Sequence, residues 1–260
     1  MVMQRISGTD GLGPTEFTFQ DMKNLMFSDI QYGASLIKPQ LVSMCRSLPG
    51  GLAPTAAGTI AVGDSCRVLA AWNGRENPDA RGAVLFRAFG ENALSLPNGP
   101  WSHPFRAASP VTTPYGLDTA SKQVQRSFGD GLAALKAAHL PYNVALGTVQ
   151  YVVRDGRKIS LPGGPGDPDG EFDAINEDAV QNPGKDPSSG SSYIQAVTWK
   201  SGDSCPEASM LLTYSESANP ASPDYADQTE LFSRRKWMTA YFCPDQVAAH
   251  AVSTTVLRGR

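Results

Sequence analysis

The residues of this chain best suited to covalent or metal chemistry are four cysteines and three histidines. No two of the cysteines, Cys45, Cys66, Cys205 and Cys243, form a CxxC pair. With so few histidines, the chain has little material for a zinc site. Four cysteines can form two disulfides in three connectivities, or stay as buried free thiols in a reducing compartment. The spacing favours the local pairs Cys45–Cys66 and Cys205–Cys243, each closing a loop worth about 3 kcal/mol.

The three histidines are weak candidates for catalysis. The sequence contains no GxSxG elbow, phosphate loop, dinucleotide fingerprint or HExxH motif. A Ser–His–Asp triad stays open, because its members are scattered along a chain. However, His103 falls in a proline-rich stretch, and His139 and His250 fall at the ends of expected helices, where a helix dipole favours a cation. We assign none of them a catalytic role and expect no metal or cofactor.

An acidic run occupies a glycine-rich stretch of the chain. Asp167, Asp169, Glu171 and Asp173 alternate with other residues there. Clustered carboxylates suit a calcium ion, but the EF-hand spacing is missing, since no glutamate closes the loop after a central glycine. We therefore favour a solvated loop for this run.

The first half of the chain has the apolar spacing of helices. Phe19 to Met44 repeat apolar residues at steps of three and four, with Thr18 and Asp21 as a capping box and Pro39 as an expected kink or split. Further helices are predicted for three stretches: 62–72, 78–89 and 119–138. The proline-rich stretch 97–114 is expected to be irregular.

The second half has the pattern of strands. Residues 149–161 predict a hairpin with Asp155-Gly156 at its turn. Strands are also expected at 193–199 and 208–214, short helices at 227–232 and 244–250, a loop at 162–190 and a strand-like tail at 253–257. The fold class is therefore α+β, with a mainly helical segment, residues 1–145, and a strand-rich segment, residues 146–260.

Composition and charge exclude several function classes. The net charge is −3 and both signs are mixed along the chain, so no basic stripe indicates nucleic acid or an anionic lipid surface. No apolar run is long enough to span a membrane. The first residues, Met1-Val-Met-Gln-Arg, lack the apolar core of a signal peptide. Glycine and proline number 25 and 20, which predicts a loop-rich chain.

One segment is rigid by composition. In Asn219-Pro-Ala-Ser-Pro-Asp-Tyr-Ala-Asp-Gln two prolines, an asparagine and an aspartate fix a turn-rich path. Such a path could form the wall of a pocket or clamp two strands together, and the residues alone do not favour either role.

This segment also carries a family resemblance. Leu211 to Trp237 resemble the closing motif of the penicillin acylase family, and the stretch Gly190-Ser-Ser-Tyr-Ile-Gln-Ala-Val resembles a strand of that family. Gln4-Arg-Ile-Ser-Gly-Thr-Asp-Gly-Leu-Gly resembles a stretch in the middle of the family's β chain. The acyl-homoserine-lactone and aculeacin acylases are the most similar branch. Glu216 stands where glutamine is usual in the family and Asp224 where histidine is usual.

The resemblance implies an N-terminal-nucleophile hydrolase. Such enzymes have an αββα sandwich, are exported, and cleave themselves into α and β chains. The new N-terminal serine attacks an amide carbonyl, its α-amino group acts as base, and an asparagine and backbone N–H groups hold the oxyanion. The family's catalytic residues correspond to positions before Met1. Arg5 is out of alignment with a family arginine near the site, and cleavage at Gly190-Ser191 would leave too little chain for a site, so neither receives a role.

We therefore expect the C-terminal part of an acylase β chain and a partial sandwich, inactive alone. The partner would be the missing N-terminal part, the substrate a small acylated amide such as an N-acyl homoserine lactone or a lipopeptide. The resemblance implies a periplasmic or secreted protein. One alternative is a non-catalytic subunit that complements a separately encoded acylase piece; another is a binding module that uses the 97–114 loop. A partial sheet has open edges, so we also expect poor solubility when the chain is expressed alone.

Overall fold

The computed structural model describes residue 8 and residues 17–166, 170–177, 180–187 and 189–259. The helices, with two single turns of 3-10 helix, are α2 (Phe19–Met26), α3 (Tyr32–Ser47), η1 (Pro49–Gly51), α4 (Ser65–Ala71), α5 (Ala83–Leu94), α6 (Lys122–Ala137), α7 (Leu146–Val149), η2 (Pro223–Tyr225), α9 (Asp227–Ser233) and α10 (Pro244–His250). The strands are β1 (Leu52–Thr55), β2 (Gly58–Ala61), β3 (Trp101–His103), β4 (Tyr115–Leu117), β5 (Tyr151–Arg154), β6 (Arg157–Ser160), β7 (Ile175–Asn176), β8 (Ser189–Gly190), β9 (Tyr193–Thr198), β10 (Glu207–Leu212) and β11 (Met238–Ala240).

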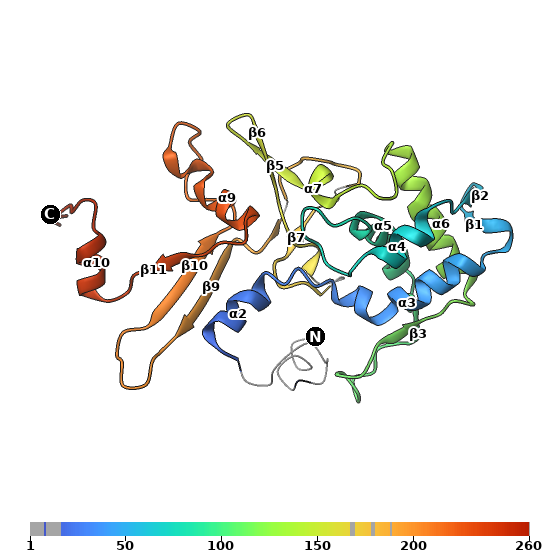
Figure 1. Ribbon diagram of the computed structural model, residues 1–260, viewed down its shortest axis with the longest axis horizontal. Helices are drawn as coiled ribbons and strands as arrows, with labels where there is room; N and C mark the ends of the chain where they lie inside the picture. The colour runs from blue at the N-terminus through green and yellow to red at the C-terminus, as the bar shows by residue number, and fades with distance from the viewer. Residues whose placement is uncertain (1–7, 9–16, 167–169, 178–179, 188, 260) are drawn as a thin grey trace.

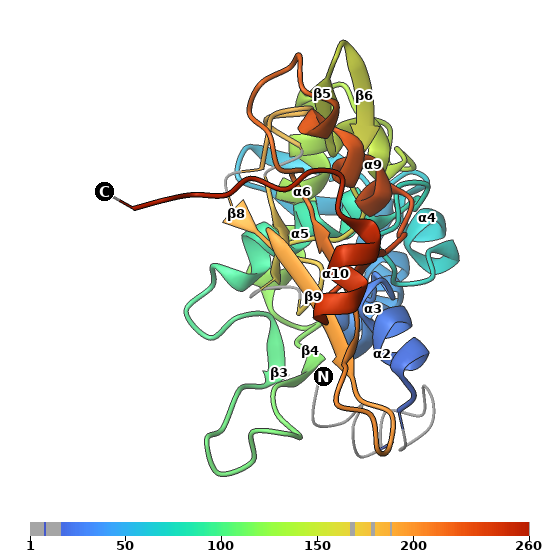
Figure 2. The same ribbon diagram turned by 90° about the vertical axis from the view of Figure 1, so that its left-hand side faces the viewer.

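The strands form small antiparallel sheets. Strands β11, β10 and β9 make a three-stranded sheet in that order, and the other described strands pair as β1–β2, β3–β4, β5–β6 and β7–β8. The three-stranded sheet lies at one end of the molecule and helices α3 to α6 lie at the other (Figure 1). Helix α10 lies outside this sheet, to its left in Figure 1 and in front of it in Figure 2. This mixture agrees with an α+β class, and the αββα sandwich stays a prediction.

The helical half is organised around the contact between α5 and α6. Gly131 of α6 lies so close to α5 that a Cβ atom there would be 2.6 Å from the carbonyl oxygen of Ala88. Gly129 faces β1 in the same way, 2.0 Å from the carbonyl oxygen of Pro54. Both sites need glycine because any side chain would overlap a backbone. The core around them includes the fully buried Leu41, Leu69, Phe89, Phe128 and Leu132.

A second core lies under the C-terminal sheet. Leu211 of β10 and Ile194 of β9 pack there with Phe232 of α9. Phe27 joins them from the link between α2 and α3, with its ring centroid 5.7 Å from that of Phe232 and 5.2 Å from that of Trp237. The N-terminal helix α2 is therefore attached to the C-terminal sheet, although the two are about 200 residues apart in sequence.

The structure corrects the predicted helix from Phe19 to Met44. That stretch forms two helices, α2 and α3, and α3 continues through Pro39. The break lies earlier, where Asp29 has a φ of 51° and Ile30 forms a β-bridge with Arg75. Backbone pairing with residues 74–76 competes with the helix at this point, whereas buried side chains on both sides of Pro39 hold α3 together.

Other boundaries also differ from the sequence prediction. Helix α5 begins five residues later than the predicted start at residue 78, because Gly82 has a φ of 115° and packs against Trp72. The β1–β2 hairpin was not predicted, and residues 253–257 form no strand. The capping box of Thr18 and Asp21 is confirmed. So is the β5–β6 hairpin, whose turn places Asp155 and Gly156 at positive φ.

Candidate functional site

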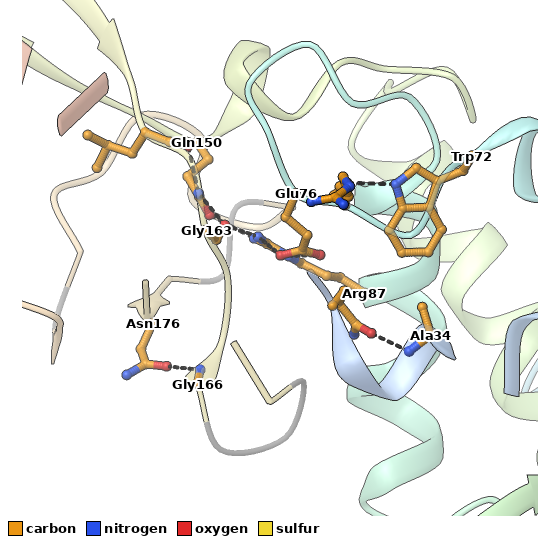
Figure 3. A network of polar contacts seen from close by, with 11 residues as sticks. Ala34, Trp72, Glu76, Arg87, Gln150, Gly163, Gly166 and Asn176 are labelled. Atoms are coloured by element: carbon orange, nitrogen blue, oxygen red, sulfur yellow. Dashed lines mark hydrogen bonds and ion pairs between the residues drawn. The ribbon is translucent and has the colours of Figure 1, made fainter. Parts of the chain in front are cut away.

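A set of buried polar side chains connects the helical half with the strand-rich half, and Figure 3 shows three of them, Glu76, Arg87 and Gln150. We call it the buried carboxylate cluster. Its members are Asp29, Glu76, Arg87, Gln150, Glu171 and Asp173, each at most 8% exposed. Since burying a charge is costly unless it is paired and hydrogen-bonded, such a cluster must be held by specific contacts.

Glu76 and Arg87 form the centre of the cluster. The Nε of Arg87 donates to both carboxylate oxygens of Glu76 at 2.9 Å, and one Nη also contacts that carboxylate. The same guanidinium donates to Oε1 of Gln150 at 2.7 Å and to the carbonyl oxygen of Gly163 at 2.6 Å. Gln150 in turn donates to the carbonyl oxygens of Leu161 and Gly163, both at 2.9 Å (Figure 3). Arg87 on α5 therefore binds the segment 150–163 to the helical half.

Two glycines allow the chain to approach this ion pair. A Cβ atom on Gly164 would lie 1.8 Å from Oε2 of Glu76 and 2.7 Å from an Nη of Arg87. Gly163 has a φ of 90°, and a Cβ atom there would lie 2.0 Å from the carbonyl oxygen of Asp173. Glycine at positions 163 and 164 is thus required by contact with the cluster.

Asp29 and Asp173 form the second part of the cluster. Oδ2 of Asp29 accepts a hydrogen bond of 2.9 Å from Arg235, which comes from the end of α9. The Asp29 and Asp173 carboxyl groups also face and influence each other, and a hydrogen bond between two carboxyl groups requires a proton on one of them. This contact joins the α2–α3 link to the loop after β6. The hydrogen bond from Arg235 joins the segment after α9 to the same α2–α3 link.

Burial and like charges favour the protonated form of the carboxyl groups in the cluster. Burial raises the pKa of Asp173 well above its usual range, and the neighbouring Asp29 and Glu76 carboxylates raise it further. Burial also raises the pKa of Asp29 and of Glu76, although Arg235 and Arg87 oppose those shifts. We assign the proton to Asp173, because Asp29 and Glu76 each face an arginine.

The cluster links segments rather than presenting a nucleophile. Glu76 is fully buried and Arg87 is 4% exposed. A cavity of about 570 Å³ lies outside it, lined by α2 together with Arg75, Arg235 and Trp237. In the part of the chain that the structure describes, no group of three His, Cys, Asp or Glu side chains is arranged to hold a metal ion. The arrangement can neutralise charge, hold a proton and fix the segments that carry its members against one another.

The structure corrects the prediction of a solvated acidic loop. Glu171 and Asp173 are buried, at 8% and 1% exposure, because they contact the cluster. Asp167 and Asp169 lie outside the described residues. Sequence reasoning also missed Asp29, Glu76, Arg87 and Gln150. The available signal was Arg87, a charge in the middle of the apolar helix Ala-Val-Leu-Phe-Arg-Ala-Phe.

The histidines do not meet in one site. His103 lies in β3, with its ring stacked on Tyr115 at 4.0 Å between centroids. His139 follows α6 with a φ of 57°, and its N–H donates to the carbonyl oxygen of Lys136. His250 ends α10 and stacks on Tyr241.

The Asn219–Gln228 segment connects β10 to α9. Gln228 accepts a hydrogen bond of 2.8 Å from the backbone N–H of Leu212 and donates one of 2.7 Å to Glu216. The hydroxyl of Ser215 accepts from the N–H of Thr229 at 3.0 Å. These bonds attach the end of β10 to α9, a strand to a helix, whereas the sequence left open a pocket wall or a clamp between two strands.

Ser191, at the alternative cleavage point, is also used structurally. Its hydroxyl accepts from the N–H of Ala174 at 3.1 Å and donates to the carbonyl oxygen of Phe172 at 3.2 Å. A serine held in this way supports the loop that carries Asp173.

The cysteines are joined in the two local pairs that the spacing favours. Cys45 and Cys66 link α3 to α4 with 5.6 Å between Cα atoms, and Cys205 and Cys243 link the β9–β10 turn to the start of α10. Among the described residues, no helix is long and apolar enough to cross a membrane.

Comparison with known proteins gives a consistent set of relatives. A sequence model of the penicillin amidase family matches residues 2–249. Aculeacin-A acylase of Actinoplanes utahensis is 32% identical over 250 residues, which cover 95% of this chain and 30% of that protein. The acyl-homoserine lactone acylase PvdQ of Pseudomonas fluorescens is 30% identical over 237 residues, which cover 88% of this chain and 28% of that protein. PvdQ of Pseudomonas putida is 31% identical over 252 residues, which cover 95% of this chain and 30% of that protein. The chain spans less than a third of the length of these relatives.

Proposed function

Because the chain belongs to the penicillin amidase family, we propose that it is the C-terminal part of the β chain of an enzyme that hydrolyses acyl amides. One observation carries this proposal. Residues 2–249 match the family, yet the same region is only 30% of aculeacin-A acylase. The remaining part of such an acylase would be the partner of this chain.

The proposed reaction uses a nucleophile outside this chain. An N-terminal serine attacks the acyl carbonyl, its α-amino group takes the hydroxyl proton, and the amine leaves with a proton. Water then hydrolyses the acyl-enzyme and releases a carboxylic acid. Because no residue of this chain is assigned to those steps, we propose that it is inactive alone. The substrates would be N-acyl homoserine lactones or acylated peptides, by analogy with the names of the relatives.

Within such an enzyme, this chain would act as a scaffold. The bonds from Arg87 to Gln150 and Gly163 and the Asp29–Asp173 contact bind residues 1–145 to residues 146–260. We propose that both segments belong to one αββα sandwich. The two disulfides support a periplasmic or extracellular location, because disulfides persist in oxidising compartments.

The proposal is tested by exchange with aculeacin-A acylase. The aligned 30% of that enzyme is replaced by this chain, and the hybrid is assayed for release of the fatty acid from an acylated amide. We expect the hybrid to mature and turn over substrate, whereas the purified 260-residue chain gives no turnover. A hybrid whose N-terminal serine is replaced by alanine is the negative control. Turnover by the chain alone would overturn the proposal.

A second arm separates one polypeptide from two subunits. The N-terminal part of aculeacin-A acylase is co-expressed with this chain, and in parallel with its own C-terminal part. Activity of both pairs supports the alternative of a separately encoded, non-catalytic subunit. If the parent pair is active and both the hybrid and this pair are soluble but inactive, the scaffold role is wrong.

A further inference from the structure

A cavity on the helical half, away from the buried carboxylate cluster, has the features of a ligand site. It has a volume of about 670 Å³, within the range of about 300–1,000 Å³ typical of small-molecule pockets. One wall is α4 and the other is the end of α6 with the loop 140–143. We call it the α4–α6 cavity.

The surface of this cavity combines an apolar floor with a cationic rim. Val68, Ala71, Leu140 and Pro141 line it together with the ring of Tyr142. Its charged residues are Arg67, Arg81, Lys136 and Asp64, three cations and one anion. The Asp64 carboxylate is 2.8 Å from Arg67, so the cavity keeps two uncompensated positive charges.

Two polar groups at the rim are available to a ligand. The ammonium group of Lys136 and the hydroxyl of Tyr142 have no hydrogen-bond partner among the described residues. Tyr142 is only partly buried, and its ring rests against Gly63, where an added Cβ atom would lie 3.7 Å away. An ammonium and a phenol can both donate hydrogen bonds to a carboxylate.

The walls are fixed by contacts within the chain. Arg81 donates to the carbonyl oxygen of Asn143 at 2.8 Å, and the N–H of Leu140 donates to the carbonyl oxygen of Leu135 at 2.9 Å. On the other side the Cys45–Cys66 disulfide holds α4 against α3. The cavity is therefore present before any ligand binds, which lowers the entropic cost of binding.

We propose that the α4–α6 cavity binds a small organic anion, namely a carboxylate with an apolar body. The apolar part lies on the floor formed by Val68 and Leu140, and the carboxylate is held by Lys136, with Tyr142 as a second donor. This site is separate from the proposed amide hydrolysis and does not require it.

The test is a titration of the purified full-length chain with octanoate, followed by ligand-observed NMR. Two probes are matched to it: octanol has the tail without the charge, and acetate has the charge without the tail. We expect saturable binding of octanoate, with octanol and acetate at least about tenfold weaker. Raising the salt concentration weakens octanoate binding, because the rim is exposed to solvent.

Two lysine variants test whether octanoate binds in the α4–α6 cavity. Lys136→Gln is expected to weaken octanoate binding by about threefold to tenfold. Lys122→Gln, an exposed lysine at the other end of α6, is the matched control and leaves binding unchanged. A melting curve for each variant verifies folding. A diazirine-bearing octanoate should label residues 64–71 or 136–143.

Three results would overturn the proposal. These are no saturable binding of octanoate, equal binding of octanoate and octanol, and equal effects of Lys136→Gln and Lys122→Gln. Because the readout is binding to the isolated chain, failure here leaves the proposed acylase function standing. Failure of the hybrid enzyme likewise leaves this site untouched.

Discussion

The helical half and the C-terminal sheet differ in how far their apolar side chains are buried. In the helical half, Leu69, Phe128 and Leu132 are fully buried. In the sheet, β9 turns Ile194 toward the second core but leaves Tyr193 50% exposed and Val197 37% exposed. The helical half therefore encloses its own core, whereas the sheet has one packed face and one open face.

The pairing of the strands places the exposed residues of β9 on one face of the sheet, on which Ala208 of β10 is buried. Tyr193 lies opposite Leu212, and Val197 lies opposite Ala208, so their side chains share one face of the sheet. Apolar surface of this kind is typical of association. The comparison teaches that helices enclose the core of the first half, whereas the sheet packs on one face and leaves Tyr193 and Val197 of the other face exposed.

The largest expected effect is at the boundary between the two regions. Arg87→Met leaves the buried Glu76 carboxylate without its partner and should lower the free energy of unfolding by about 3–5 kcal/mol. Urea denaturation followed by circular dichroism measures the loss. The double variant Arg87→Met/Glu76→Leu should recover most of it, because it removes the unpaired charge. The exposed ion pair of Arg67 and Asp64 is the control, and Arg67→Gln should change the free energy of unfolding by less than about 1 kcal/mol. A loss below about 1 kcal/mol for Arg87→Met would contradict the role of the cluster.

The next largest effect is expected from removing a disulfide, and it should differ between the helical half and the C-terminal region. Replacing Cys45 and Cys66 by alanine should cost about 3 kcal/mol, because that disulfide lies within the helical core. The Cys205–Cys243 loop is longer, and loop entropy alone predicts at least as large an effect. However, α10 has no buried residues, so we expect its release to be local and to cost less than about 1 kcal/mol. Urea denaturation of both double variants measures the two losses of unfolding free energy. A larger loss for the Cys205/Cys243 variant than for the Cys45/Cys66 variant would refute the comparison.

The cluster should also make stability depend on pH. The folded-state pKa of Asp173 is raised above its unfolded value. The folded chain therefore keeps a proton that the unfolded chain has lost, and the free energy of unfolding falls as pH rises from about 4 through the raised pKa. Each retained proton contributes about 1.4 kcal/mol per pH unit in that window. The raised pKa values of Asp29 and Glu76 act in the same direction.

Asp173→Asn tests this dependence. The variant keeps a hydrogen-bonding side chain but cannot titrate, so its stability should change less with pH than that of the parent chain. Denaturation midpoints from pH 5 to pH 8 give the slope. Asp245→Asn, on the exposed first turn of α10, is the control and should keep the parent slope. An unchanged slope for Asp173→Asn would show that the proton resides elsewhere.

The smallest effect on stability is expected on the open face of the sheet. Val197→Lys should change the free energy of unfolding by less than about 0.5 kcal/mol, because the side chain is already exposed. It should nevertheless reduce self-association at high protein concentration, as measured by sedimentation velocity. Ile194→Ala on the packed face is the contrast and should cost about 2–5 kcal/mol. Equal costs at the two positions would mean that the face is covered.

The sequence predicted local features well and long-range contacts poorly. The Thr18 capping box and the Asp155-Gly156 turn depend on residues within three or four positions of each other, and both are present. The break at Asp29 depends on pairing with Arg75, and the later start of α5 depends on Gly82 packing against Trp72. Such boundaries are decided by partners that are distant in sequence, so a local pattern does not reveal them.

The candidate site shows the same division. Its members come from segments around residues 29, 76, 87, 150 and 171–173, and no spacing pattern connects them. The acidic run was visible in sequence, but its burial was not, because a carboxyl group is buried only where partners such as Arg87 and Arg235 compensate for the lost water.

The sequence by itself determined the family of this chain, its α+β class and the turns and caps that its short motifs specify. The closing motif, residues 211–237, was sufficient for the resemblance, because a long rigid segment of defined residues rarely recurs by chance. Only the tertiary structure decided that this motif clamps β10 to α9, that two acidic residues of a glycine-rich loop are buried, and that α4 and α6 enclose a cationic cavity. The physical reason is that burial and electrostatic compensation are properties of groups brought together in space, whereas capping, turn formation and helix periodicity are properties of neighbouring residues.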